Sequence, residues 1–345
     1  MSEAKTCLFD VPGCAALRRT LRCDPEQFRR VRNALLKTFA SDAVATAEFI
    51  GRDRLAIHAL TLEQRHESAV DGATKLLLRT GQGLLTETVV LRIASGRCTV
   101  CVSSQVGCAA ACQFCATGTM GIARSLSTAE ILDQVLQAGQ ILAEQGRRLR
   151  NVVFMGMGEP FHNEANVHAA VDRLLDPAGF HLSPSKILVS TVGVIDAMLR
   201  FAERFPRVGL ALSLHSVEPD TRRKLIPLAK KNPLPELRRT IAELNRIQGR
   251  GVMLEYLMLQ DVNDSDEDAD ALVAWTEGLD VHINVIPYNP IDDAPHLQAT
   301  PRTRVDAFAA RLRDAGRKTT RRHSLGRDIE AACGQLVKRS NLRPR

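Results

Sequence analysis

Residues 98–115 read Cys98-Thr-Val-Cys101-Val-Ser-Ser-Gln-Val-Gly-Cys108-Ala-Ala-Ala-Cys112-Gln-Phe-Cys115 and hold five of the chain's nine cysteines. The other four cysteines are scattered along the sequence. In a cytosolic protein such a cluster indicates metal or redox chemistry rather than structural disulfides. The apolar start of the segment predicts a strand. The three closely spaced cysteines therefore fall in the loop that follows this strand.

From residue 98 onward, strand-like apolar runs alternate with amphipathic stretches. One such stretch covers 128–145, where Ile131, Val135 and Leu136 recur at helical spacing. Six strand–helix units imply a parallel sheet, and right-handed crossovers curl such a sheet into a complete or partial barrel. We predict an α/β fold, a partial (β/α)6 barrel with its functional residues at the carboxyl ends of the strands. The six predicted strands are 99–103, 151–155, 186–191, 208–214, 252–259 and 282–287.

The cysteines at 108, 112 and 115 have the spacing C-x3-C-x2-C. Three thiolates can ligate three irons of a cubane [4Fe–4S] cluster and leave the fourth iron open to a cofactor. A structural zinc site needs a fourth ligand at short spacing, and the nearby sequence offers no paired C-x2-C or H-x3-H. Unligated buried thiols are the remaining alternative. We predict that Cys108, Cys112 and Cys115 bind one [4Fe–4S] cluster.

Length and composition indicate one large domain with smaller additions. The chain has 345 residues, of which 45% are hydrophobic, enough for a sizeable core. We predict a helical N-terminal domain (1–75), a β-hairpin linker (76–97), the barrel (98–322) and a C-terminal segment (323–345). No apolar run approaches the roughly 20 residues of a membrane span, and the first residues lack the apolar stretch of a signal peptide. We therefore expect a cytoplasmic protein without a membrane segment.

The net charge of +7 is concentrated at one end of the chain. Residues 301–345 hold thirteen basic side chains against four acidic ones, an excess of nine positive charges. A localised positive excess predicts a surface that binds a polyanion such as nucleic acid. A solvated basic helix is the alternative.

Polar residues follow the predicted strands at their carboxyl ends. In Met155-Gly-Met-Gly158-Glu159-Pro, small residues let the backbone approach a ligand, and the carboxylate can accept from an ammonium group. Hydroxyl, imidazole and amide groups at Ser190, Ser213-Leu214-His215 and Asn289 suit a ribose or an adenine edge. Each group alone could be a satisfied structural polar group. Their joint placement at one barrel mouth favours ligand binding.

With Phe114 in the aromatic position, C-x3-C-x-aromatic-C resembles the signature of the radical S-adenosylmethionine (SAM) enzymes. The resemblance implies that the open iron chelates SAM, and that one electron cleaves SAM to a 5′-deoxyadenosyl radical. Two further blocks narrow it: Cys101-Val-Ser-Ser-Gln-Val-Gly-Cys108 and Asp328-Ile-Glu-Ala-Ala-Cys333-Gly-Gln-Leu. From roughly residue 80 to residue 337, the chain is similar to the radical SAM 23S rRNA adenine methyltransferases, the RlmN/Cfr family.

The resemblance implies a role for each matching residue. Cys333 is the cysteine that becomes methylated, and Cys101 is its resolving partner. Glu87 is a proton acceptor, although a solvated strand carboxylate is the alternative at this position. The iron–sulfur cluster is bound by Cys108, Cys112 and Cys115. The implied SAM site comprises Gly158, Glu159, Ser190, Ser213, Leu214, His215 and Asn289.

An adenine ring carbon is electron-poor and cannot attack a sulfonium, so a radical must be delivered to it. The implied scheme uses two cysteines. Cys333 would take a methyl group from one SAM by nucleophilic displacement. A second SAM would supply the radical that activates the S-methyl group to add to adenine. Release requires proton removal from the ring and attack of Cys101 on the sulfur of Cys333, which leaves a disulfide. Two SAM molecules are therefore consumed in each turnover.

The resemblance also implies the partners. The substrate is adenosine 2503 of 23S rRNA, unstacked into the barrel mouth, and some members also modify adenosine 37 of tRNA. The N-terminal domain engages RNA in this family. An electron donor such as flavodoxin or ferredoxin reduces the cluster. We expect the enzyme to act as a monomer.

Two departures from the family pattern leave alternatives open. The segment Arg322-His-Ser-Leu-Gly matches neither the members that methylate carbon 2 nor those that methylate carbon 8. Asp24-Pro-Glu-Gln-Phe-Arg only loosely matches the family's E-P-x-Y-R. A diverged member acting on tRNA or another RNA, a non-methylating radical SAM enzyme such as a methylthiotransferase, and a redox-sensing RNA-binding protein therefore stay as alternatives.

Overall fold

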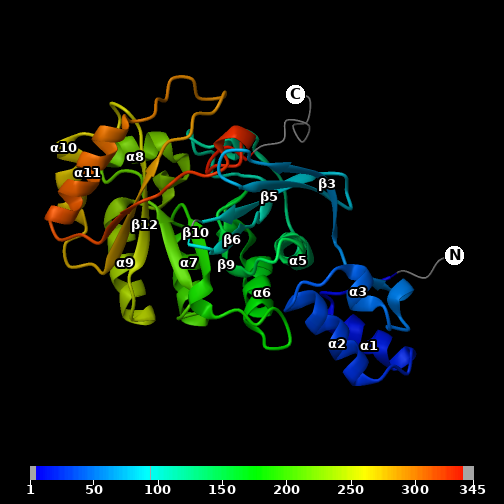
Figure 1. The fold of residues 1–345 in the computed structure, drawn as a ribbon. Coiled ribbons are helices and arrows are strands. Elements are labelled where there is room, and N and C mark those ends of the chain that lie inside the picture. Colours follow the sequence, from blue (N-terminus) through cyan, green and yellow to red (C-terminus); the bar gives the residue numbers. More distant parts are fainter. Residues whose placement is uncertain (1–4, 94, 337–345) are drawn as a thin grey trace.

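Ten strands form one continuous sheet in the computed structural model, which describes residues 5–93 and 95–336 (Figure 1). The strand order is β14-β13-β12-β11-β10-β9-β6-β5-β4-β3. The strands are β3 (Leu60–Glu67), β4 (Thr74–Thr80), β5 (Leu85–Arg92), β6 (Cys98–Cys101), β9 (Leu149–Phe154), β10 (Ile187–Thr191), β11 (Gly209–Ser213), β12 (Val252–Met258), β13 (Val281–Pro287) and β14 (Thr319–Arg321).

Within this sheet, the seven strands β6 and β9 to β14 pair in parallel and in chain order, as a series of right-handed strand–helix units requires. All six predicted strands are present, with ends within two residues of the prediction. β14 is a seventh parallel strand that the prediction missed, because Thr319-Thr320-Arg321 carries no apolar side chain. The outer strands of the sheet are β14 and β3, so the predicted partial α/β barrel is confirmed.

Helices between the parallel strands cover one face of the sheet (Figure 1). The α5 helix begins at a capping box, in which Ser127 and Glu130 satisfy each other's backbone N–H groups. The α9 helix ends at Gly249, whose φ of 59° is left-handed. The helices are α1 (Val11–Thr20), α2 (Pro25–Leu36), α3 (Asp42–Thr46), α4 (Ala116–Thr119), α5 (Thr128–Glu144), α6 (Glu164–Leu175), α7 (Ile195–Arg204), α8 (Pro219–Leu225), α9 (Leu234–Gln248), α10 (Asp266–Trp275) and α11 (Arg302–Asp314).

The N-terminal part is helical over α1 to α3 and then turns to strand. A short parallel pair, β1 (Thr6–Cys7) and β2 (Leu55–Ala56), closes the helical part. The helical texture expected up to about residue 75 is wrong for Leu60–Glu67, which forms β3 and pairs antiparallel with β4. After Leu60 the side chains of β3 are exposed, so this edge strand carries no apolar alternation. The predicted hairpin is present as β4 and β5, and β5 pairs antiparallel with β6.

A buried carboxylate fastens the N-terminal part to the barrel. Asp133 of α5 is fully buried and accepts hydrogen bonds from the backbone N–H groups of Ala59 and Leu60 at 2.9 and 2.8 Å. His58 lies between Asp133 (2.7 Å) and Asp42 of α3 (3.0 Å). Burial alone would lower the pKa of His58, but its hydrogen bonds to the two carboxylates raise that pKa to about 10.

Candidate active site

The three clustered cysteines lie in a loop after β6, at the carboxyl end of the sheet. A small antiparallel pair, β7 (Gln105–Gly107) and β8 (Ile122–Ser125), closes the base of this loop. Gly107 has a φ of +80°, and a Cβ atom there would lie 2.0 Å from the carbonyl oxygen of Gly121. Only glycine allows the two sides of the loop to approach so closely.

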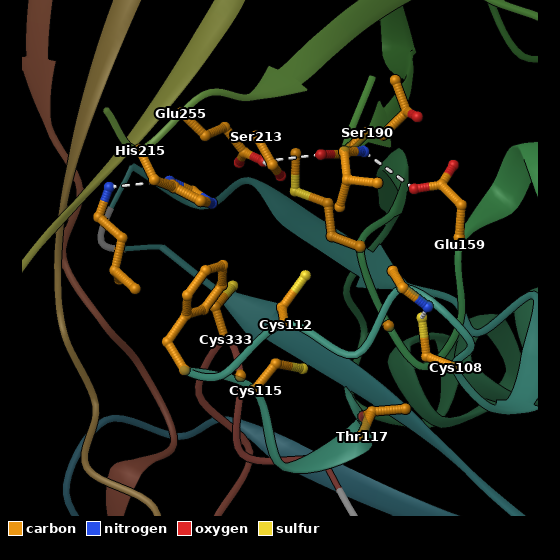
Figure 2. A pocket seen from close by; sticks show the side chains of 18 of the residues that line it. Cys108, Cys112, Cys115, Thr117, Glu159, Ser190, Ser213, His215, Glu255 and Cys333 are labelled. Atoms are coloured by element: carbon orange, nitrogen blue, oxygen red, sulfur yellow. Dashed lines mark hydrogen bonds between the residues drawn. The ribbon is translucent and has the colours of Figure 1, made fainter. Parts of the chain in front are cut away.

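Cys108, Cys112 and Cys115 line one cavity of about 140 Å³. Figure 2 shows the three cysteines on one side of this cavity, with Glu159, Ser190, Ser213 and His215 on the opposite side. The cavity thus joins the loop to the carboxyl ends of the parallel strands. Gly158 and Cys333 also line it.

The surroundings of the three thiols suit metal-bound sulfur. Burial raises the pKa of Cys108 to about 12 and that of Cys112 well above its ordinary value, so a bound cation is needed to hold them as thiolates. The backbone N–H of Ala110 donates to the Cys108 sulfur at 3.4 Å, a contact typical of iron–sulfur sites. In the described residues no three ligating side chains share a single metal position, whereas a cubane takes one thiolate at each of three irons. The residues present fit such a cluster.

Glu159 forms the acidic wall of the cavity. Its carboxylate accepts from the backbone N–H groups of Phe161 and Val192 at 3.0 and 2.9 Å. Burial raises the pKa of Glu159 to about 6, although these hydrogen bonds favour the charged form. The preceding Gly158 has a φ of +99°, and a Cβ atom there would lie 2.6 Å from Gln105. The loop therefore needs glycine to bring Glu159 into the cavity.

The His215 ring stands between the cysteine loop and β12. Its Nδ1 accepts from the backbone N–H of Leu257 at 3.1 Å, and its ring meets Phe114 edge-on with centroids 4.7 Å apart. Burial and the nearby Arg222 lower the pKa of His215 to about 3. The imidazole is therefore neutral near pH 7, with Nε2 left as its N–H donor.

Glu255 of β12 is a cavity residue that the sequence analysis missed. It accepts from the hydroxyls of Ser190 and Ser213 at 2.7 and 3.3 Å, so it fixes both serines of the predicted SAM site. The Arg322 guanidinium lies 3.7 Å from it. A carboxylate inside the apolar run Val252-Met-Leu-Glu255-Tyr-Leu was the available signal, because a charge within a buried strand needs a partner.

Arg222 is a second missed residue, and it is almost fully buried. Its guanidinium donates to the carbonyl oxygens of Ser213 and Val192, each at 2.8 Å, and to that of Leu214. It therefore holds the ends of β10 and β11 together. Leu214 itself does not line the cavity, since its side chain packs in the main core.

Cys333 and Cys101 line a second, smaller cavity of about 20 Å³ next to the first. Burial raises the pKa of Cys333, while the charge of Arg322 and its hydrogen bond to the thiol act to lower it. Burial and then the neighbouring Cys333 raise the pKa of Cys101 to about 12. All nine cysteines are free thiols in this structure.

The segment that carries Cys333 is hydrogen-bonded to the cysteine loop. The backbone N–H of Ala116 donates to the carbonyl oxygen of Gly334 at 2.7 Å, and the Thr117 hydroxyl donates to that of Leu336. The Asn289 amide donates to the carbonyl oxygen of Cys333 at 3.1 Å. Asn289 therefore positions this segment and does not line the cavity.

Glu87 lies in neither cavity. It is buried on β5, 3.5 Å from the Lys75 ammonium group, and lines a wide cleft of about 900 Å³ between the hairpin and the C-terminal segment. Ala116 of the cysteine loop and Gln335, close to Cys333, line the same cleft. The predicted proton acceptor thus faces the outer side of the Cys333 segment.

Much of the basic C-terminal charge is paired within the described residues. Arg311 bridges to Asp270 at 2.6 Å and Arg321 to Asp306 at 2.6 Å, and Arg304 bridges to Asp266 at 2.7 Å. The remaining basic residues of the tail include four at 338–345, outside the described part of the chain. Among the described residues, no helix is both long and apolar enough to cross a membrane.

The chain matches a protein-family model, curated relatives and a solved structure. Residues 102–273 match the family model of the Radical SAM superfamily. The chain is 56% identical over 340 residues to a probable RNA methyltransferase of Rhodopirellula baltica, across 99% of this chain and 90% of that protein. It is 44% identical over 267 residues to a probable dual-specificity RNA methyltransferase RlmN of Thermus thermophilus, across 77% and 75% of the two chains. A crystal structure of a radical SAM methyltransferase from Sphaerobacter thermophilus matches with a TM-score of 0.89 and 35% identity, across 96% and 98% of the two chains.

Proposed function

This chain belongs to the RlmN/Cfr family of radical SAM RNA methyltransferases, and we propose that it methylates carbon 2 or carbon 8 of an adenine in 23S rRNA, at adenosine 2503. The observation that carries this proposal is that Cys333 lines the same cavity as Cys108, Cys112 and Cys115. A thiol at that position can carry a methyl group to the place where the radical forms. The RNA substrate is inferred from the names of the relatives.

The cavity divides between the two cofactors. The three cysteines would hold the [4Fe–4S] cluster, and Gly158, Glu159, Ser190, Ser213 and His215 would hold SAM. When bound, the cluster supplies the electron that splits SAM into methionine and a 5′-deoxyadenosyl radical, chemistry that no side chain can supply. Glu159 accepts from the ammonium group of SAM, and the serines fixed by Glu255 position its ribose.

Cys333 acts as the methyl carrier. Its thiol must ionise to attack the methyl group of the first SAM, and the adjacent Arg322 favours the thiolate against the cost of burial. The S-methyl group of Cys333 would then lose one hydrogen atom to the radical that a second SAM supplies, and its carbon would bond to the adenine ring. The RNA is thereby linked to Cys333.

Cys101 resolves the adduct. It lines the smaller cavity together with Cys333, which supports a thiol–disulfide step between them. The adduct would first lose its ring proton and give one electron back to the oxidised cluster. Attack by the Cys101 thiolate on the sulfur of Cys333 then breaks the bond from that sulfur to the methylene carbon, which takes up a proton and becomes the methyl group of the released RNA. The resulting Cys101–Cys333 disulfide must be reduced by a dithiol reductant before the next turnover. The structure shows all nine cysteines as free thiols and no disulfide, so this bond is proposed for one stage of turnover alone. Each turnover uses two SAM molecules, and a flavodoxin or ferredoxin restores the reduced cluster in the cytoplasm, where we expect the enzyme to act as a monomer.

Three alanine variants test the proposal. Cys101→Ala should trap a covalent protein–RNA adduct, and Cys333→Ala should give neither adduct nor methylation. Cys98→Ala is the matched control, because Cys98 is a buried thiol on the same strand as Cys101 and lines neither cavity. The assay is denaturing gel electrophoresis with labelled 23S rRNA. Multiple turnover by either of the first two variants would exclude the two-cysteine scheme.

Mass spectrometry then defines the product. RNA from cells with and without the gene is digested to nucleosides, and 2-methyladenosine is resolved from 8-methyladenosine in separate 23S rRNA and tRNA fractions. A methylated adenosine confined to 23S rRNA supports the proposed substrate. Methylation confined to tRNA would make tRNA the substrate instead. The absence of 5′-deoxyadenosine from reduced, reconstituted enzyme would exclude radical SAM catalysis.

A further inference from the structure

A cavity of about 290 Å³ lies between the N-terminal helices and the barrel, apart from the site described above. Residues from α1, α2 and α6 line it, and Figure 1 shows these three helices at the lower end of the molecule. Four of the lining residues are the arginines Arg18, Arg29, Arg32 and Arg173, and no acidic side chain is among the described residues that line it. The rest of the lining is apolar or small.

Helical spacing places Arg18 and Arg32 on the faces of α1 and α2 that line the cavity, whereas the Arg29 side chain is mostly exposed. Val11, Cys14 and Arg18 recur on one side of α1, and Phe28 and Arg32 recur on the facing side of α2. The next arginines along each helix, Arg19 and Arg30, are exposed and do not line the cavity. The positive lining is therefore specific to one face of each helix.

The arginines of this pocket hold unused hydrogen-bonding capacity. Arg29 pairs with Glu26 at 2.6 Å and Arg173 pairs with Asp176, whereas Arg18 and Arg32 form no ion pair with any residue that the structure describes. The Nε atoms of Arg32 and Arg173 are buried without a hydrogen-bond partner in the same part of the chain. Buried donors of this kind are costly unless an acceptor reaches them. A bound anion would supply that acceptor.

The lining matches a nucleotide. Guanidinium groups bind phosphate through paired N–H donors, and the apolar side chains of Val11 and Phe28 suit a sugar or a base. At about 30 Å³ for each water, the cavity has room for roughly ten waters, more than a lone phosphate fills.

The pocket lies away from the reacting cysteines. The α6 helix begins at Glu164, just after the loop that carries Glu159, and Arg173 lies near its other end. At about 1.5 Å for each residue, the two ends of this stretch are roughly 14 Å apart along the helix. A nucleotide in the pocket is therefore a different one from the nucleotide at Cys333.

Building on the proposed function, we propose that this arginine pocket binds a phosphate-linked nucleotide of the RNA substrate, remote from the methylated adenosine. The pocket is formed jointly by α1, α2 and α6. RNA held there bridges the N-terminal helices and the barrel. The arginines thereby contribute to the affinity for RNA and do not contact the reacting groups.

Two double variants of equal charge test this. Arg18→Ala/Arg32→Ala removes two pocket arginines, and Arg19→Ala/Arg30→Ala removes two neighbours on the same helices outside the pocket. The Kd for a 23S rRNA fragment containing adenosine 2503 is measured by filter binding over a range of salt concentrations. The pocket variant should raise Kd about tenfold or more and lower the salt slope of log Kd by about 1 to 2. The outer pair should change Kd less than threefold.

Further measurements separate the possible failures. Iron content, circular dichroism and RNA-independent 5′-deoxyadenosine formation should match wild type in both variants, and Arg18→Lys/Arg32→Lys should recover most of the salt slope but only part of the affinity. If the two double variants change Kd equally while the wild type still methylates RNA, the proposal for the pocket is wrong and the proposed function stands. A wild type that neither binds nor methylates RNA would overturn the proposed function as well.

Discussion

The carboxylate of Glu255 accepts a hydrogen bond from the hydroxyl of Ser190 at 2.7 Å, which joins β12 to β10 across the intervening β11. The same carboxylate lies 3.7 Å from the Arg322 guanidinium. One acidic group therefore connects the serines proposed for SAM with the arginine beside Cys333.

Replacing Glu255 by glutamine should weaken SAM binding. Glu255→Gln keeps the size of the side chain but removes the negative charge of the oxygen to which both serine hydroxyls donate, so these hydrogen bonds weaken. We expect the KM for SAM to rise about tenfold, with a smaller change in kcat. Initial rates of 5′-deoxyadenosine formation against SAM concentration measure both. Glu243→Gln, at an exposed pair with Arg246, is the control, and an unchanged KM in Glu255→Gln would contradict the assigned role.

Removing Arg322 should make Cys333 harder to ionise. The guanidinium acts to lower the pKa of Cys333, so Arg322→Gln raises that pKa and reduces the thiolate present near pH 8. If the pKa of Cys333 rises by about 1, the thiolate fraction and the rate of alkylation both fall about tenfold. The measurement is the pH profile of Cys333 alkylation, followed by peptide mass spectrometry. Arg321→Gln is the control because Arg321 pairs with Asp306, and identical profiles for the two variants would exclude the effect.

Glu87→Gln should accumulate the same protein–RNA adduct as Cys101→Ala if Glu87 accepts the ring proton. Glu87 lies beside Lys75 and lines the cleft on the outer side of the Cys333 segment. Its charge can therefore reach RNA bound there. The adduct is measured on denaturing gels, with Glu63→Gln, a carboxylate paired with Arg79 on the hairpin, as the control. Normal turnover by Glu87→Gln would remove Glu87 from the reaction.

His58 should stabilise the protein in a defined range of pH. Its pKa in the folded protein is about 10, above its ordinary value of 6.5. The stabilisation is therefore fully present below about pH 6.5 and is lost as the pH rises through about 10. His58→Gln should lower Tm by about 2 to 5 °C at pH 7, with a smaller difference near pH 10. His66→Gln, on the exposed face of β3, is the control, and a pH-independent difference would contradict the ion-pair explanation.

The parallel strands were predictable because they are buried on both faces. A strand such as Val252–Met258 reads as a nearly continuous apolar run, and that signal needs no knowledge of its neighbours. The cysteine loop was predictable for a similar reason, since its three thiols lie within eight residues. Local patterns suffice where the physics is local.

The polar side of the site depends on packing between distant segments. Nothing in the sequence around Glu255, Arg222 and Arg322 identifies their partners, and only the sheet order brings these residues together with them. The polar edge strands β3 and β14 carry no apolar period and were missed for that reason. The resemblance to a family proposed pairing Cys101 with Cys333, and the structure supplies the shared cavity.

The two hydrogen bonds between the cysteine loop and the C-terminal segment also limit which segments of the enzyme can be truncated or exchanged. Ala116 and Thr117 directly follow Cys115, and both donate to carbonyl oxygens just beyond Cys333. A truncation before residue 333 would remove the proposed methyl carrier, Cys333. It would also remove two hydrogen-bond acceptors from the loop that is proposed to hold the cluster. The C-terminal segment is therefore not an exchangeable cassette. Chimeras between relatives should transfer it together with residues 108–121.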